Sequence, residues 1–398
     1  YRGHVFWDAD VFVLPFLAAT HPASARAMLE YRVRRLPQAR EAAARQGYAG
    51  ARFPWEAAAE GVDVTPPAIR LPTGELIRIR TGEAEEHIVA DVAWAAAHYV
   101  DWTGDREFAE GAGRELLAET ARYWASRVRY DRAGRAHIYG VIGPDEYHEP
   151  VDDNAFTNVM ARWNLRRAAE SAAADEDERA RWLAVADALV DGYDPRTGVY
   201  EQFSGFHRLE PVAIAALAPR PLAADRLLGV QRVRGAQVAK QADVLMLHHL
   251  LPDEVEPGSL LPNVDHYEPR TAHGSSLSPA VHAALHARAR RFDEALEALS
   301  IAARLDLDNL MGSTAGGLHL ATMGGVWQAL ASGFAGLRPA GDRLLVDPRL
   351  PPSWNALELS LQFRGEPLRL RLHGGGVEVD SDRLKLRRRN GIWEVVFA

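Results

Sequence analysis

The sequence predicts a mainly α-helical protein in which helix pairs form a closed ring, followed by a small antiparallel β domain. About ten segments before residue 335 carry apolar residues at spacings of three and four, the pattern of amphipathic helices. Short connections between consecutive segments favour antiparallel hairpins. Beyond residue 337 the period changes to two, as in half-buried strands. An open solenoid is the alternative, but it would need a clear repeat period, which the sequence does not show.

The predicted helices are 11–20, 23–46, 86–103, 106–128, 155–172, 177–190, 237–251, 277–290, 292–304 and 325–336, with 212–217 as a weaker addition. The predicted strands are 357–363, 368–372, 377–379 and 384–386. The segment 337–354 is rich in proline and glycine and is interpreted as the passage between the two kinds of structure. We therefore expect a helical domain that carries the chemistry over residues 1–336 and a small β domain over residues 337–398.

Composition excludes several classes of protein. Of the 398 residues, 47% are hydrophobic and 25% are charged, which is typical of a folded globular protein rather than a disordered one. The formal net charge of -8 is spread along the chain, which argues against nucleic acid as a partner. No apolar run reaches membrane-spanning length, and no signal-peptide pattern is visible. A chain without cysteine suits a reducing compartment, so we expect a cytoplasmic protein without a thiolate metal site.

The most chemically loaded stretch is the segment 143–149, with the sequence Gly-Pro-Asp-Glu-Tyr-His-Glu. Its glycine and proline exclude a helix interior, so the segment is predicted to form a loop before the helix that follows. Glu146 is followed there by the rings of Tyr147 and His148, and a partly desolvated carboxyl can stay protonated and donate its proton to a leaving oxygen. The polar segment 152–154 has a structural interpretation, because these residues can cap the next helix.

Two segments place an indole ring beside a carboxylate. Trp7 precedes Asp8, and Trp55 precedes Glu56. A pyranose ring requires an apolar face and a polar edge, so both pairs are candidate sugar-binding residues. The structural alternatives are that Asp8 or Asp10 caps the next helix and that Trp55 belongs to the core.

Other polar residues lie near predicted helix starts. The segment 85–87 and Asp91 place polar groups on a helix face that is otherwise apolar and predicted to be buried. The favoured explanation is a structural network in which these polar groups form hydrogen bonds with one another. Lys240 and Gln241 precede an apolar run and can clamp sugar hydroxyls, although the start of a surface helix explains them nearly as well.

The segment 271–279 combines a glycine with paired serines just before the helix that starts near Leu277. Free backbone N–H groups, hydroxyls and the helix dipole favour an anion there, and a phosphate would fit. The candidate phosphate-binding residues share this loop or a second glycine-rich segment: His273, Gly274, Ser275, Ser276 and His319. The alternative is a serine N-cap in an ordinary tight loop, since the segment is not a Walker motif. The histidines are scattered without ligand spacing, so no metal is expected.

Six segments, taken in order, resemble the motifs of glycoside hydrolase family 65 over nearly the whole chain: 2–8, 53–56, 143–154, 240–241, 273–278 and 325–328. That family contains the maltose, trehalose, kojibiose and nigerose phosphorylases and some hydrolases. The resemblance implies an (α/α)6 barrel followed by a small β domain, in agreement with the helix and strand patterns. It also implies a small-molecule α-glucoside and phosphate as partners, a possible homodimer, and no cofactor other than inorganic phosphate as co-substrate.

Carried over to this chain, the resemblance implies that Glu146 is the general acid and that Trp7 and Asp8 hold the glucosyl unit. Lys240 and Gln241 would hold its hydroxyls from the other side, and the candidate phosphate-binding residues would hold phosphate. The chain departs from the family at Asp10, where glutamate is more usual, and at Ala57, where serine often follows the Trp-Glu pair. Members usually carry an N-terminal β-sandwich and a helical linker before the barrel, and the given sequence contains neither. Because it starts at Tyr1 without methionine, we expect it to be a fragment or a processed chain.

The predicted reaction is inverting phosphorolysis of an α-linked glucose disaccharide to β-glucose 1-phosphate and a released sugar. Inversion needs one acid and a nucleophile on the opposite face of the sugar, and phosphate needs no basic carboxylate to activate it. Hydrolysis is an alternative if Glu268 acts as that base, and a non-catalytic sugar-binding remnant is another. Sugar epimerisation on a similar barrel would need His148 and His319 to face each other across the pocket.

Overall fold

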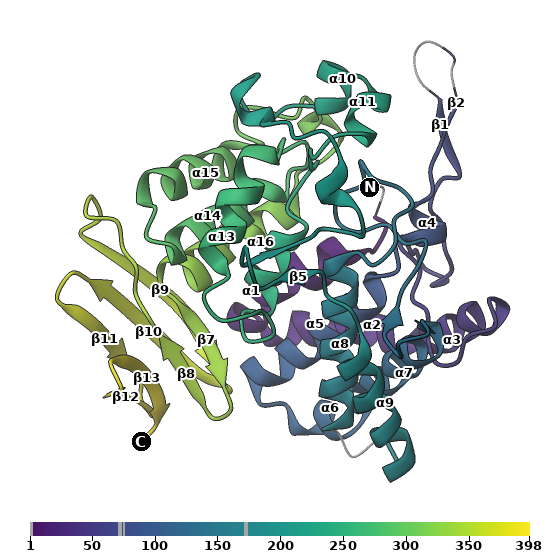
Figure 1. The fold of residues 1–398 in the computed structure, drawn as a ribbon. Coiled ribbons are helices and arrows are strands. Elements are labelled where there is room, and N and C mark those ends of the chain that lie inside the picture. Colours follow the sequence, from purple (N-terminus) through teal and green to yellow (C-terminus); the bar gives the residue numbers. More distant parts are fainter. Residues whose placement is uncertain (1–2, 71–73, 75, 171–173) are drawn as a thin grey trace. The chain divides into compact units, whose positions relative to one another are not determined.

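The structure is a computed structural model that describes residues 3–70, 74, 76–170 and 174–398. Figure 1 shows the chain, coloured from the N-terminus to the C-terminus. Backbone contacts divide it into two compact units. The first unit comprises Tyr1–Val11, Leu29–Ala96 and Glu110–Gly274, and the second comprises Phe12–Met28, Ala97–Ala109 and Ser275–Ala398. The predicted boundary at residues 336 and 337 stays a prediction. Arg2, from a predicted motif, and Ala172, from a predicted helix, lie outside the described residues.

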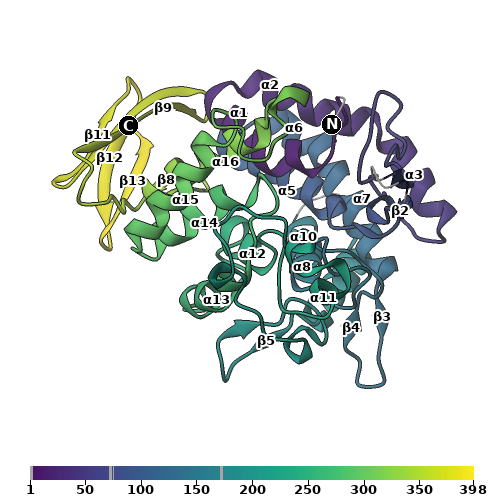
Figure 2. The ribbon, with the colours of Figure 1, turned by 90° about the horizontal axis from the view of Figure 1, so that it is seen from above.

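Helices dominate the first unit. Its longer helices are α3 (Leu36–Arg45), α7 (Ala112–Arg127), α8 (Ala155–Ala169), α9 (Glu176–Ala188), α12 (Val244–Leu250) and α13 (Leu260–Tyr267). Its shorter ones are α4 (Thr81–Ala84), α10 (Ala224–Leu228) and α11 (Val230–Arg234). Helix α8 packs against α7, α9 and α12, and Figures 1 and 2 show α7 and α8 side by side. This packing fixes α8, whose N-terminus follows the acidic loop.

Small hairpins and shared helices complete the first unit. The hairpins are β1 (Ala68–Arg70) with β2 (Leu76–Arg78), β3 (Arg129–Tyr130) with β4 (Ala136–His137), and β5 (Tyr193–Asp194) with β6 (Val199–Tyr200). Three helices contain residues of both units, because a boundary between the units falls within each of them: α2 (Pro22–Arg34), α5 (Ile88–Thr103) and α6 (Arg106–Glu110). A π-helix, η1 (Asp8–Val13), does the same near the N-terminus.

The helical part of the second unit contains α1 (Leu14–Thr20), α14 (Ser278–Arg288), α15 (Phe292–Arg304), α16 (Leu320–Gln328) and the π-helix η6 (Ala329–Phe334). Helices α14 and α15 form the antiparallel hairpin that the single-residue connection predicts, and both views of the ribbon show them side by side. Gly333 sits so close to Ala284 of α14 that an added Cβ would lie 2.7 Å from its Cα. Small residues at this crossing therefore let η6 approach α14 closely.

The rest of the second unit is antiparallel β structure, visible as the yellow and yellow-green arrows of Figure 1. One sheet has the order β11-β10-β9, with β9 (Ala356–Phe363), β10 (Glu366–His373) and β11 (Gly376–Asp380). The other has the order β12-β13-β8-β7, with β7 (Leu337–Ala340), β8 (Arg343–Val346), β12 (Leu384–Arg389) and β13 (Ile392–Phe397). The predicted strands are confirmed. The predicted passage 337–354 instead contains β7 and β8, and β13 went unrecognised.

Several predicted helices are interrupted or displaced. The single helix predicted over 23–46 is wrong, because the chain breaks at Arg35 and Pro37 falls in the first turn of α3. The helix predicted over 106–128 divides at Gly111 into α6 and α7. The helix predicted over 237–251 begins only at Val244, which leaves Lys240 and Gln241 in a bend of the chain before the helix. Helix α13 was missed altogether. No helix in the described part of the chain is long and apolar enough to cross a bilayer.

Candidate active site

Glu146 lies in the first unit, on the loop between β4 and α8. The loop turns at Gly143, where an added Cβ would overlap Asn154 and Asp243, so no other residue fits without movement. The side chain of Glu146 keeps 32% of its surface exposed, and the Nζ of Lys240 lies 2.8 Å from its Oε1. Glu146 is thus the most exposed acid of the segment 143–149, and its carboxyl contacts the ammonium of a residue far away in the sequence.

Asp145, the preceding residue, is almost wholly buried and holds the loop in place. Four donors converge on its carboxylate: the backbone N–H of Lys240 (2.7 Å), Nδ1 of His148 (2.6 Å), Nε2 of Gln202 (2.8 Å) and the backbone N–H of Tyr147 (3.2 Å). A buried carboxylate with several donors is well satisfied. Because Asp145 binds the backbone of Lys240 directly, it fixes the spacing between Lys240 and Glu146. No sequence pattern distinguishes the buried Asp145 from the more exposed Glu146.

Two further buried groups brace Asp145. Asp243 accepts the N–H of Asp145 at 3.1 Å and the Nδ2 of Asn154 at 3.1 Å. Burial, and then the nearby charge of Asp145, raise the pKa of Asp243 to about 7. His148 contacts Asp145 through Nδ1 and the carbonyl of Ala236 through Nε2, at 2.9 Å. Burial favours the neutral ring, but the carboxylate of Asp145 outweighs it and raises the pKa of His148.

The segment that carries Lys240 runs beside the first part of the predicted phosphate loop. The N–H of Gly274 donates to the carbonyl of Lys240 at 2.8 Å, and Ala239 and Thr271 form a parallel bridge. An added Cβ on Gly274 would lie 3.2 Å from the hydroxyl of Tyr147. Three segments that are separate in the sequence, 143–149, 239–241 and 271–274, therefore meet within one unit.

Gln241 takes a different position from the one expected of a hydroxyl clamp. Its side chain is buried, and its Nε2 donates to the carbonyl of Pro144. It therefore braces the backbone next to Asp145, and its possible contact with sugar stays a prediction. His273 is also buried, with a φ of 53° at the point where the chain turns towards Gly274.

The remaining predicted phosphate-binding residues belong to the second unit. Ser276 accepts the Oγ1 hydroxyl of Thr322 on its backbone carbonyl at 3.0 Å. Helix α14 starts at Ser278, and its N-cap residue, Leu277, forms no side-chain cap, so the predicted alternative of a serine N-cap is wrong. The imidazole of His319 lies 2.6 Å from Asp306 through Nδ1 and 3.3 Å from Ser313 through Nε2. A carboxylate partner of this kind orients a histidine ring.

The indole pairs are buried rather than open. Trp7 and Trp55 pack against each other with centroids 6.1 Å apart, and both rings contact the edge of His87, at 5.0 Å and 5.3 Å. Phe156 of α8 closes the cluster. Glu56 binds His4 through a 2.7 Å contact between Oε2 and Nδ1. The burial of Trp55 agrees with the alternative interpretation as a core residue, and its contact with sugar stays a prediction.

Asp8 and Asp10 both lie in the π-helix η1, but their surroundings differ. Asp10 is buried against Arg32, with a distance of 3.2 Å between its Oδ1 and Nε, so it forms an ion pair rather than a cap. Asp8 has a buried Oδ1 without a hydrogen-bond partner in the described structure. Burial and the charge of Glu146 raise the pKa of Asp8 to about 8. π-Helical turns are frequent at functional sites, which agrees with this placement of Asp8.

The predicted capping residues have separate roles. Asn154 is the N-cap of α8 and accepts the N–H of Thr157 at 2.9 Å, which confirms this part of the prediction. Asp152 accepts the N–H of Gly140 at 2.9 Å, and Asp153 accepts that of Ile138 at 3.1 Å. These two carboxylates therefore hold the preceding segment instead of capping the helix.

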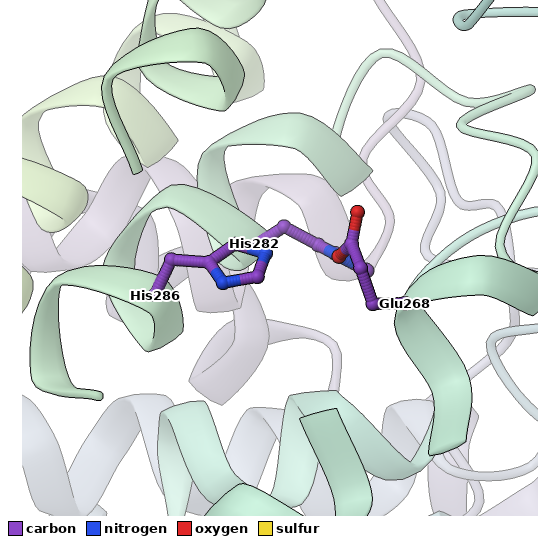
Figure 3. A group of neighbouring side chains, drawn as sticks. All are labelled: Glu268, His282 and His286. Carbon is purple, nitrogen blue, oxygen red and sulfur yellow. The ribbon is translucent and has the colours of Figure 1, made fainter. Parts of the chain in front are cut away.

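A metal site was not expected, but the argument from spacing is wrong for one pair of histidines. His282 and His286 are one turn apart on α14, and Figure 3 shows both side chains on that helix. Two ligands four residues apart on a helix are a spacing that zinc sites use, but such sites need further ligands. Glu268, also labelled in Figure 3, belongs to the first unit, where the Nη2 of Arg220 lies 2.7 Å from its Oε1. The absence of a metal stays a prediction.

Comparison with known proteins agrees with these observations. The model of the glycosyl hydrolase family 65 central catalytic domain matches residues 1–328, and that of the family's C-terminal domain matches residues 337–388. Kojibiose phosphorylase of Halothermothrix orenii is 39% identical over 95% of this chain and 51% of its own length. Alpha,alpha-trehalose phosphorylase of Geobacillus stearothermophilus is 34% identical over 98% of this chain and 51% of its own. The chain thus spans about half the length of the curated relatives it matches.

A solved structure from the human microbiome, provisionally named a kojibiose phosphorylase, matches 99% of this chain and 59% of its own with a TM-score of 0.86 and 25% identity. This match confirms the predicted fold class, an (α/α)6 barrel with a small C-terminal antiparallel β domain. Because a family model covers residues 1–328 of 398, this chain belongs to glycosyl hydrolase family 65.

Proposed function

We propose that this chain carries the active site of an inverting glycoside phosphorylase. The substrates are an α-linked glucose disaccharide and inorganic phosphate, and the products are β-glucose 1-phosphate and a released sugar. The observation that carries the proposal is the pair formed by Glu146 and Lys240, accessible to solvent and held by buried Asp145 beside the first part of the predicted phosphate loop. The names of the relatives, which are kojibiose and trehalose phosphorylases, support the same class of reaction.

Glu146 acts as the general acid. A phosphate oxygen attacks the anomeric carbon from the face opposite the leaving oxygen, the glycosidic bond breaks, and the leaving oxygen takes the proton of Glu146. The phosphate group loses its own proton when it becomes an ester, and that proton restores Glu146. Lys240, 2.8 Å away, stabilises the carboxylate that Glu146 becomes after the transfer.

The nucleophile is phosphate rather than a water activated by a carboxylate. Glu268, the candidate base for hydrolysis, is engaged by Arg220, whose Nη1 and Nη2 bind its carbonyl and its carboxylate. Such a two-point contact holds the side chain in the first unit and opposes its movement towards a sugar. Epimerisation is also disfavoured, because both ring nitrogens of His148 are used by Asp145 and Ala236.

The test measures disaccharide turnover with and without phosphate, over kojibiose, trehalose, maltose and nigerose. We expect glucose 1-phosphate of β configuration, identified by NMR, only when phosphate is present. Free glucose formed equally well without phosphate would refute the proposal and favour hydrolysis.

The role of Glu146 is tested by Glu146→Gln, which removes the proton and keeps the shape. Turnover is expected to fall by about 10²-fold or more, the usual range for loss of a general acid, while sugar binding remains. The matched control is Glu170→Gln, since Glu170 is an exposed glutamate at the end of α8. Equal turnover in the two variants would remove Glu146 as the acid.

A further inference from the structure

We propose that Glu85 is an additional sugar-binding residue, whose Oε2 forms a hydrogen bond with a hydroxyl of the glucosyl unit next to Glu146. The inference rests on the proposed function, because that function places a glucosyl unit at Glu146. It goes against the favoured explanation of segment 85–87 and Asp91 as a satisfied structural network, because two oxygens of that network, Oε2 of Glu85 and Oδ1 of Asp91, have no hydrogen-bond partner in the described structure.

Glu85 is attached directly to the chain that enters the acidic loop. It follows α4, its N–H donates to Thr81 at 2.8 Å, and the carbonyl of Ala84 accepts the N–H of Ile142 at 2.9 Å. Ile142 precedes Gly143, the first residue of the acidic loop. The backbone pairing therefore brings the 84–85 segment against the start of the loop that carries Glu146.

The side chain of Glu85 is fixed through one oxygen only. Its Oε1 lies 3.3 Å from Nε2 of His87, and Nδ1 of His87 lies 2.6 Å from Oδ2 of Asp91. All three side chains are inaccessible to solvent. Burial favours a neutral His87, but Asp91 and then Glu85 raise its pKa to about 10, so the ring can donate from both nitrogens at neutral pH.

The second oxygen, Oε2 of Glu85, is buried and has no hydrogen-bond partner in the described structure. Leaving a buried acceptor or a buried acid proton without a partner is unfavourable, and such groups in native proteins usually have a ligand, water or functional reason. Burial raises the pKa of Glu85 well above the usual value, so Oε2 can accept from a hydroxyl when ionised or donate to one when protonated. A sugar hydroxyl satisfies either state.

A further carboxyl oxygen without a partner occurs in the first unit, outside that network. Oδ1 of Asp8, a predicted glucosyl-binding residue, is also buried without a partner. Besides burial, the charge of Glu146 raises the pKa of both Asp8 and Glu85 and the charge of Lys240 lowers it, so the four groups of the first unit interact electrostatically. His87, which holds Glu85, touches the rings of Trp7 and Trp55. The unsatisfied oxygens of Asp8 and Glu85, two carboxyls that both interact with the charge of the proposed acid, are groups that the hydroxyls of a sugar would satisfy.

The test measures binding of glucose and of its 2-, 3-, 4- and 6-deoxy analogues, without phosphate, by titration of tryptophan fluorescence. The variant Glu85→Met keeps the length of the side chain and removes both oxygens. The matched control is Glu83→Met, because Glu83 is exposed on the same short helix and pairs with Arg78. We expect wild-type protein to bind one deoxy analogue about 10-fold or more weakly than glucose, the effect of one hydrogen bond to a charged group.

Glu85→Met should bind glucose only as tightly as wild-type protein binds that one analogue. The analogue itself should bind equally well to Glu85→Met and to wild-type protein. A uniform loss for every sugar, or wild-type affinity for glucose, would overturn the inference. If Glu85→Met does not fold, Glu85→Asp, which withdraws the carboxyl by one methylene, must show the same selective loss. Binding without phosphate is independent of turnover, so failure of the phosphorolysis assay and failure of this inference are separate results.

Discussion

Asp145→Asn is expected to destabilise the first unit more strongly than its small chemical change suggests. The buried carboxylate accepts four donors, and an asparagine in its place has one acceptor oxygen, which can keep two of them. The other two donors then face an amide N–H₂. Since each hydrogen bond to a charged group contributes about 1.5 to 3 kcal/mol, the loss is about 3 to 6 kcal/mol in the free energy of unfolding.

The measurement is urea unfolding followed by tryptophan fluorescence, because Trp7, Trp55 and Trp124 are buried in the same unit. Asp152→Asn is the matched control. Asp152 is exposed in the same loop and accepts one backbone N–H, which asparagine can also accept, so the change should stay within about 0.5 kcal/mol. If the two variants unfold at the same urea concentration with the same slope, Asp145 does not hold the loop.

Three other predictions follow from the same contacts. Asp243 has a pKa of about 7 in the folded protein against the ordinary 3.8, so its contribution to stability is present below about pH 4 and is lost as the pH rises to about 7. Relative to wild type, the free energy of unfolding of Asp243→Asn should therefore increase by on the order of 4 kcal/mol over that pH window. A difference in urea unfolding that does not change with pH would contradict this. Arg32→Met leaves Asp10 buried without its cation and should cost about 3 to 5 kcal/mol, whereas the double variant with Asp10→Leu should recover much of the loss. Lys240→Arg should lower disaccharide turnover by about 10²-fold, because a planar guanidinium cannot replace a compact ammonium 2.8 Å from Glu146. The control is Lys385→Arg, at an exposed position of β12. Equal activity of the two variants would contradict the role of Lys240.

The amino-acid composition also indicates that Lys240 has a specific role, independently of the motifs. The chain contains 46 lysines and arginines, of which only Lys240 and Lys385 are lysines. A chain that uses arginine almost everywhere keeps a lysine opposite the proposed acid. Arginine and lysine differ in shape and hydration, so such a position is a candidate for a specific contact.

Part of the candidate site could be predicted from the sequence, and part could not. Motifs selected Glu146, Asp8, Lys240 and Gly274 as candidates, since residue types and order carry that information. They could not assign Asp145, because one acidic residue next to another looks the same until the loop conformation turns one inward and the other outward. Glu85 was assigned to a structural network for a similar reason, since a sequence does not show which oxygen of a carboxyl lacks a partner.

By itself, the sequence determined the helical and strand periods, the ends of hairpins such as α14 with α15, and the family to which the chain belongs. These properties depend on local spacing, because the positions of apolar residues along a short segment determine an amphipathic helix face or an alternating strand. Only the tertiary structure decided that α12 starts at Val244, that Arg32 neutralises Asp10, and that Lys240 meets Glu146. Those outcomes depend on burial and on charges far apart in the chain, since a buried carboxylate takes whichever donor the fold brings to it.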